Sequence, residues 1–179
     1  MKKVLLAVTL FISFLSYSCK DQLNRLLTFR INNESTCTIP GANMVNPIFN
    51  NIVPTPSITT NSSQTFENEG TNANLVKNIV LEKLKLAITS PSDADFRFIE
   101  SIKIYIKADG LPKVLIASKT SIPTTVGKEL ELDPTQEKLD EYIKKSNYTL
   151  ENEVVTRSAP WPEMELKINT TFKVTADPL

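Results

Sequence analysis

Strict alternation of apolar and polar side chains is the feature of this sequence that most restricts its fold. Between Ile102 and Lys107 every second residue is isoleucine, and from Met164 to Val174 the even-numbered positions are apolar apart from Thr170. Successive side chains of a strand point to opposite faces of its sheet, so this period predicts strands with one buried face. Similar short runs predict further strands at residues 27–31, 84–88, 114–117, 130–132 and 148–156.

Turns and irregular segments separate these predicted strands. Asp109 and Gly110 follow the isoleucine run and predict a hairpin turn before residues 114–117. Residues 40–65 are rich in Asn, Thr, Ser and Pro, which predicts long loops with short extended pieces. The spacing of apolar residues within 75–80 predicts one or two helical turns.

One short amphipathic helix is predicted near residues 134–145. Leu139, Tyr142 and Ile143 share one helical face at the i, i+3, i+4 spacing. Asp133 suits the N-cap position in front of them. We expect this helix to pack across one end of a sheet.

The pattern as a whole predicts a mainly β protein. Several short strands, one short helix and only four glycines favour an antiparallel β-sandwich of immunoglobulin-like or jelly-roll type. No internal repeat and no clear boundary divides the chain, so we expect one sandwich domain over residues 27–179.

The charge balance of the chain argues against two classes of partner. The sequence has 20 Lys and Arg against 20 Asp and Glu. A nucleic-acid partner requires a basic face that neutralises phosphates, and an anionic membrane surface requires a polybasic patch. We therefore expect no nucleic-acid partner and no electrostatic membrane patch.

The first nineteen residues have the layout of an export signal. Lys2 and Lys3 precede an apolar run from Val4 to Leu15, and the small or polar residues 16–18 lead to Cys19. The apolar run is too short to span a bilayer of about 30 Å hydrocarbon thickness, which favours a signal peptide. A cysteine at the cleavage point resembles the lipobox of bacterial lipoproteins, in a relaxed form because Leu15 lies one position too early.

This resemblance to bacterial lipoproteins implies a place for the protein. Residues 1–18 would be the signal peptide, Cys19 would receive the lipid, and residues 19–26 would form the lipidated N-terminus and its tether. The implied location is the outer membrane of a Gram-negative bacterium. Lys20 and Asp21 resemble a signal for display on the outer surface.

A second interpretation uses the same bond. Ser16 and Ser18 also fit an ordinary signal peptidase site, which would release a soluble protein with an unmodified Cys19. If Cys19 is acylated, Cys37 is the remaining thiol and we expect it to be buried. A Cys19–Cys37 disulfide, or reactive chemistry at Cys37, is the alternative.

The absence of histidine excludes several catalytic classes. The chain has no Ser-His-Asp or Cys-His pair and no His-ligated zinc site, and it lacks the commonest general base near neutral pH, histidine. We therefore expect no enzyme activity and no cofactor. A carboxylate-based hydrolase is the remaining catalytic route.

Asp93 and Asp95 are the nearest local pair of carboxylates. We interpret them as a turn with side-chain capping before Phe96. A calcium site built from both carboxylates and loop carbonyls is the functional alternative, since calcium prefers several oxygen ligands.

Trp161 is the sharpest candidate for ligand binding. It lies between Pro160 and Pro162, which hinder regular strand pairing and place the indole in a connection. Such a ring could stack on a sugar, with Tyr148 or Tyr105 as a second platform. The alternative is that Trp161 folds back as a lid over the end of the sandwich.

The leading functional hypothesis is therefore a lipid-anchored, non-catalytic envelope protein that acts as a structural or binding module. A carbohydrate-binding surface lipoprotein that uses Trp161 is the second hypothesis.

Overall fold

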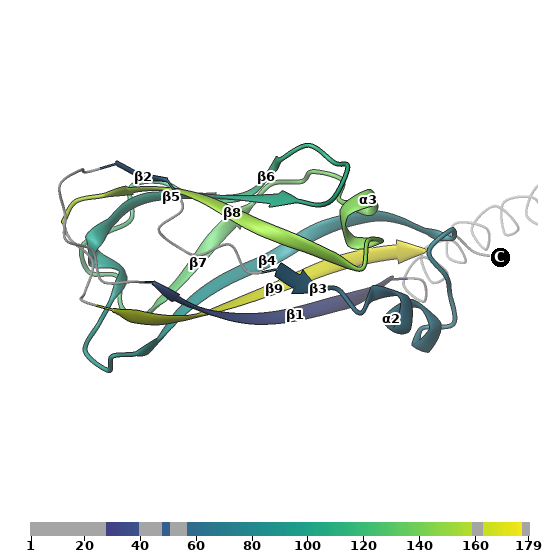
Figure 1. Ribbon diagram of the computed structural model, residues 1–179, viewed down its shortest axis with the longest axis horizontal. Coiled ribbons are helices and arrows are strands. Elements are labelled where there is room, and N and C mark those ends of the chain that lie inside the picture. The colour runs from purple at the N-terminus through teal and green to yellow at the C-terminus, as the bar shows by residue number, and fades with distance from the viewer. Residues whose placement is uncertain (1–27, 40–47, 51–56, 159–162, 177–179) are drawn as a thin grey trace, which may run out of the picture.

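Antiparallel strands make up most of the described structure (Figure 1). The computed structural model describes residues 28–39, 48–50, 57–158 and 163–176. In chain order the elements are β1 (Thr28–Ile39), β2 (Ile48–Asn50), β3 (Ser57–Thr59), α2 (Ser62–Asn68), β4 (Val76–Ser90), the 3₁₀ turn η1 (Phe96–Phe98), β5 (Ile99–Lys107), β6 (Val114–Lys119), β7 (Glu129–Pro134), α3 (Asp140–Ile143), β8 (Asn147–Thr156) and β9 (Met164–Ala176).

The strands pair as a nested set. β1 pairs with β9, β2 and β3 pair with β8, β4 pairs with β7, and β5 pairs with β6, all antiparallel. The long double ribbon that results is rolled up, so that β4 also pairs with β9 and β5 with β8. This order is that of a jelly roll. The predicted mainly β, antiparallel sandwich is confirmed, and the jelly-roll alternative describes its strand order.

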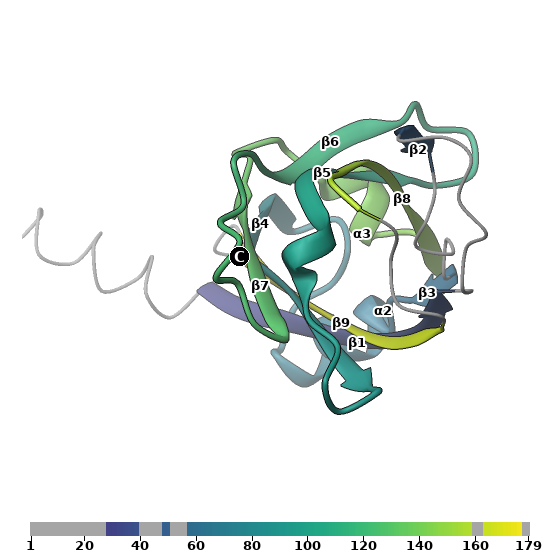
Figure 2. The same ribbon diagram turned by 90° about the vertical axis from the view of Figure 1, so that its left-hand side faces the viewer.

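Two layers of strands enclose one core. β1, β9, β4 and β7 form one layer, and β6, β5 and β8 with β2 and β3 form the other. β7 joins the layers, because its first part pairs with β4 whereas Asp133 and Pro134 pair with β6. Seen along the strands, the two layers form a nearly closed ring (Figure 2).

The predicted alternation describes the core closely. In β9 the even-numbered side chains are buried and the odd-numbered ones reach the surface. In β5, Ile102, Ile104 and Ile106 are buried as their spacing predicts. The Asp109–Gly110 turn is also confirmed: Gly110 has a positive φ of 73°, and β6 returns beside β5.

The prediction of helical turns at residues 75–80 is wrong, because β4 begins at Val76 and is strand throughout. Its register against β9 shifts between Lys77 and Val80 and again between Leu81 and Lys83. Each shift inserts an extra residue on the β4 side, a β-bulge. The bulges separate the buried residues by three positions instead of two, and this spacing imitates a helix.

The predicted helix at 134–145 is shorter than expected. β7 continues to Pro134, and the helix α3 covers only Asp140–Ile143. Thr135 donates its backbone N–H to the Ile116 carbonyl at 2.8 Å, and Leu139 donates to the Ile79 carbonyl at 2.7 Å. These long-range bonds hold the segment in front of α3 against β6 and β4. The apolar face itself is confirmed, since Leu139, Tyr142 and Ile143 are buried.

The helix α2 begins within residues 40–65, the predicted loop segment, and extends beyond it to Asn68. Its N-cap residue, Asn61, makes no side-chain capping bond, so no capping signal marks its start. Phe66 is buried and packs edge-on against Phe29 with ring centroids 6.1 Å apart. Tertiary packing of one aromatic ring therefore accounts for this helix better than local propensity does.

Truncation of the central strand should be costly. Phe172 is fully buried in β9, and we expect Phe172→Ala to lower the free energy of unfolding by about 3–5 kcal/mol. Its exposed neighbour Lys173 provides the control, since Lys173→Ala should change stability by about 0.5 kcal/mol or less. Urea unfolding measures both values. Equal, small effects would contradict the described core.

Candidate functional site

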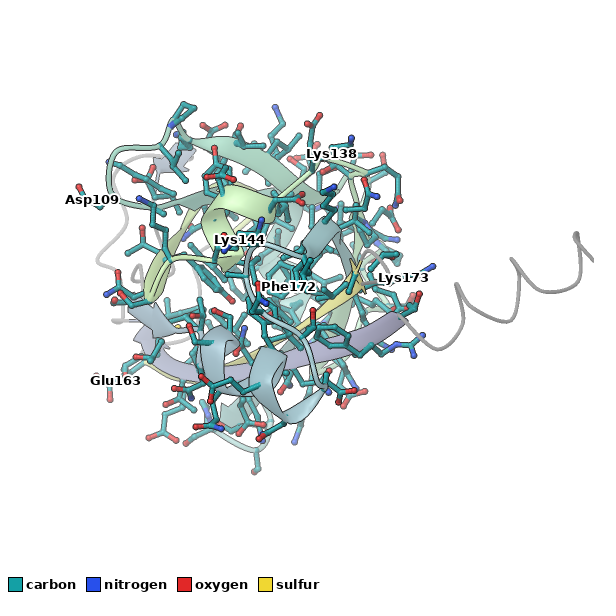
Figure 3. All side chains as sticks on the ribbon, turned by 90° about the vertical axis from the view of Figure 1, so that its right-hand side faces the viewer. Asp109, Lys138, Lys144, Glu163, Phe172 and Lys173 are labelled. Atoms are coloured by element: carbon teal, nitrogen blue, oxygen red, sulfur yellow. The ribbon has the colours of Figure 1, made fainter. Side chains whose placement is uncertain are left out.

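A groove of about 520 Å³ opens at the end of the molecule where β5 turns into β6 and β8 begins. Figure 3 looks onto this end, where Asp109 lies at the rim. The groove is lined by the turn and by the first half of β8: Lys107, Ala108, Asp109, Gly110, Leu111, Asn147, Tyr148, Thr149 and Glu151. Its volume is within the usual range for small-molecule sites.

Strand pairing brings the two walls of this groove together. Lys107 in β5 is opposite Thr149 in β8, and the Thr149 hydroxyl donates to the Lys107 carbonyl at 3.4 Å. The turn that follows Lys107 therefore lies beside Asn147, the first residue of β8. Asn147 follows Asp109 by 38 positions in the chain, so no local motif connects the two residues.

Charged side chains alternate in sign along one side of the groove. Glu151 lies 3.6 Å from the Lys107 ammonium and 3.4 Å from the Lys113 ammonium, and Lys113 also lies 3.6 Å from Glu153. These separations exceed ordinary hydrogen-bond distances, and the side chains are partly exposed. The pairs are therefore weak.

Tyr105 belongs to the same face. Its hydroxyl donates to Glu153 at 2.8 Å, and the Lys113 ammonium lies 4.5 Å from the centre of its ring. Partial burial and then the bond to Glu153 raise the pKa of Tyr105. The ring is half-exposed but already carries a cation, so a sugar could stack on it only by displacing Lys113.

Two polar groups at the groove have no partner. Among the described residues, the Asp109 carboxylate and the Asn147 side-chain amide are both exposed and make no hydrogen bond or ion pair. The sequence predicts Asp109 only as a turn residue and predicts no binding role for Asn147. The Asp109–Gly110 pair indicates a turn at this position. It does not indicate that the turn lies beside β8, because that depends on the pairing of β5 with β8.

Tyr148 is a core residue, which corrects the expectation that its ring is a stacking platform. Only 1% of Tyr148 is exposed, and its ring packs edge-on against Phe172 with centroids 5.9 Å apart. Its hydroxyl accepts from the Asn33 amide at 3.3 Å and shares a hydrogen bond of 3.2 Å with Thr170. Burial raises the pKa of this phenol. Tyr148 thus joins β8 to β1 and β9.

Asp95 caps the 3₁₀ turn η1, as the turn interpretation predicts. One carboxylate oxygen accepts from the Arg97 backbone N–H at 3.0 Å, and the other accepts from Arg97 Nε at 2.7 Å. Asp93 is exposed on the same turn. In the part of the chain that the structure describes, no group of three or more His, Cys, Asp or Glu residues could hold a metal. The calcium alternative, which combines these two carboxylates with loop carbonyls, stays a prediction.

Cys37 is half-buried rather than fully buried. It lies in β1, the edge strand next to β9, and packs against the core. Desolvation raises the pKa of its thiol to about 11. Such a thiol is mostly protonated near neutral pH and is a poor nucleophile.

Two predicted site residues, Cys19 and Trp161, lie outside the described residues. Their roles stay predictions. Within the described ranges, we find no helix whose length and apolar character would let it cross a bilayer.

No protein-family model and no curated protein matches this sequence. The chain is similar in structure to the decameric BFDV capsid protein, with a TM-score of 0.45, 11% identity, and coverage of 84% of this chain and 98% of that one. It also resembles a chain of Turnip Yellow Mosaic Virus, with a TM-score of 0.27, 13% identity, and coverage of 84% and 94%. At these values nothing about the role of the viral proteins carries over to this chain.

Capping by Asp95 can be separated from calcium binding. We expect Asp95→Ala to destabilise the fold by about 1 kcal/mol through loss of the cap, and Asp93→Ala to change stability by about 0.5 kcal/mol or less. Thermal melts with calcium and with a chelator should coincide. A calcium-dependent rise in melting temperature that both substitutions abolish would show that calcium binds to Asp93 and Asp95.

The thiol of Cys37 should react slowly in the folded protein. A pKa raised from 9.0 to about 11 lowers the thiolate fraction near pH 8 by about 100-fold. We expect alkylation of a Cys19→Ser chain to be slower by about that factor in buffer than in urea, and to accelerate as the pH rises towards 11. Equal rates in the two solvents would show that β1 does not shield this residue.

Proposed function

We propose that this chain is a lipid-anchored protein of a bacterial outer envelope, whose jelly roll acts as a binding or structural module. The observation that carries the proposal is the leader, in which an apolar run from Val4 to Leu15 ends shortly before Cys19. Two or more acyl chains on one cysteine give stable membrane attachment, whereas one chain is marginal.

The distance between Cys19 and the first strand supports this arrangement. Eight residues separate Cys19 from Thr28, where β1 begins. A fully extended segment of that length spans at most about 30 Å. A lipid at Cys19 would therefore hold the domain close to the membrane surface.

The proposal also gives the two ends of the roll different surroundings. Thr28 is opposite Thr175 and lies at the end where β9 finishes, which is also the end that carries α2 and α3 (Figure 1). The groove is lined by the β5–β6 turn and the start of β8. Thr156 and Met164, which flank the connection that contains Trp161, lie at the other end. Under the proposal this second end is the membrane-distal one, and a carbohydrate-binding role for Trp161 stays an alternative.

Cell fractionation tests the anchor. We expect the wild-type chain to sediment with the membranes and to be released by detergent, because its acyl chains lie in the bilayer. Cys19→Ser removes only the acceptor and should leave the exported domain in the aqueous fraction. The same distribution for both chains would contradict the proposal. Protease accessibility on whole cells measures separately whether the domain is displayed on the outer surface.

A further inference from the structure

The groove at the β5–β6 turn has lining groups that suit one class of small molecule. Its free groups are a carboxylate, at Asp109, and a planar amide, at Asn147. A carboxylate accepts hydrogen bonds, and an amide both donates and accepts. Hydroxyl groups of a polyol can satisfy both, because each hydroxyl is a donor and an acceptor.

The charges around the groove favour neither an anionic ligand nor a metal cation. The lining has one cation, Lys107, and two anions, Asp109 and Glu151, while Lys113 adds a second cation beside Glu151. An anionic ligand would meet the Asp109 carboxylate without a free lysine to offset it. A metal cation would need more oxygen ligands than two carboxylates, and the described residues contain no such cluster.

The backbone of the groove does not favour an extended peptide either. Thr149 pairs with Lys107 on one side and with Ser57 on the other. A peptide that adds a strand needs an open edge with unpaired N–H and C=O groups. The wall formed by Thr149 therefore offers side chains and not a strand edge.

A small apolar area completes the lining. Leu111 is partly buried and packs against the core, and Ala108 is 7% exposed. Polar groups that fix orientation, placed around an apolar contact, are the usual composition of a small-molecule site. A sugar ring presents this combination, with hydroxyls at its edge and C–H groups on its face.

We propose that this groove binds a neutral saccharide of one or two rings, with Asp109 and Asn147 as its main hydrogen-bonding residues. The proposal gives a ligand class to the binding role proposed above and rests on that role. It places the sugar site at the end opposite the one where β8 finishes and β9 begins. The shallow, exposed walls predict weak binding, with a Kd of roughly 1 mM.

The test uses the chain with Cys19→Ser, so that binding is measured independently of the anchor. Neutral mono- and disaccharides are titrated to roughly 10 mM, and binding is followed by NMR chemical shifts and by the fluorescence of Trp161, the single tryptophan. We expect shifts at residues 107–111 and 147–151 and no change in tryptophan emission. Asp109→Asn and Asn147→Ala should each weaken binding by about tenfold or more.

Matched controls keep the result interpretable. Asp93→Ala removes another exposed carboxylate, on the turn before η1, and should leave the affinity unchanged. Unchanged thermal melts show that the two groove variants are folded, and Asp109→Asn keeps the size of the turn residue.

Two outcomes would overturn the proposal. Shifts confined to residues near Thr156 and Met164, with altered tryptophan emission and full affinity in the Asp109 variant, would place the sugar at the other end. No shift with any saccharide would remove the sugar site altogether. Neither outcome affects the anchor, which the fractionation experiment decides separately.

Discussion

Pairing of β9 along both of its edges is the constraint on which the rest of the structure depends. One edge runs beside β1 from Met164 to Thr175 without a register shift, and the other runs beside β4. The inward side chains of β9, including Phe172, lie under the opposite layer and contact its core residues. Because β9 is the last of the described strands, the roll closes only when β9 returns to pair with β1. Such non-local pairing also implies slow folding relative to helical proteins.

The sequence predicts the strands better than it predicts their interruptions. Period-two alternation identifies β9, which keeps one face towards the core over its whole length, and β5, which does so from Ile102 to Lys107. Alternation fails in the first half of β4, where bulges change the spacing of buried residues. The helical spacing predicts too long a helix at α3, because Thr135 and Leu139 bond to distant strands in front of it. A bulge and a long-range backbone bond both depend on the partner strand, which a local pattern does not contain.

The same reasoning separates the successful site predictions from the unsuccessful ones. Asp95 was interpreted correctly as a cap because its partner, Arg97, is two residues away. Tyr148 was considered as a stacking ring, although it shares its phase in β8 with the buried Leu150 and Val154 and so points inward. Asp109 and Asn147 become neighbours only through the pairing of β5 with β8. No sequence signal brings them together.

Attachment and recognition are assigned to different parts of this chain. In our account a lipid at Cys19 determines where the protein works, and the groove near Asp109 determines what it holds there. The groove and Thr28 lie at the same end of the roll, so a ligand would be bound near the membrane surface. A sugar carried by a membrane lipid and a free sugar offer the same hydroxyls to Asp109 and Asn147.

The intact mass of the chain purified from a native-type host tests the central claim most directly. The account predicts a mature protein that begins at Cys19 and carries the added mass of a diacylglycerol, with or without a further acyl group. A mature chain with an unmodified thiol at residue 19, or one that retains residues 1–18, would contradict it.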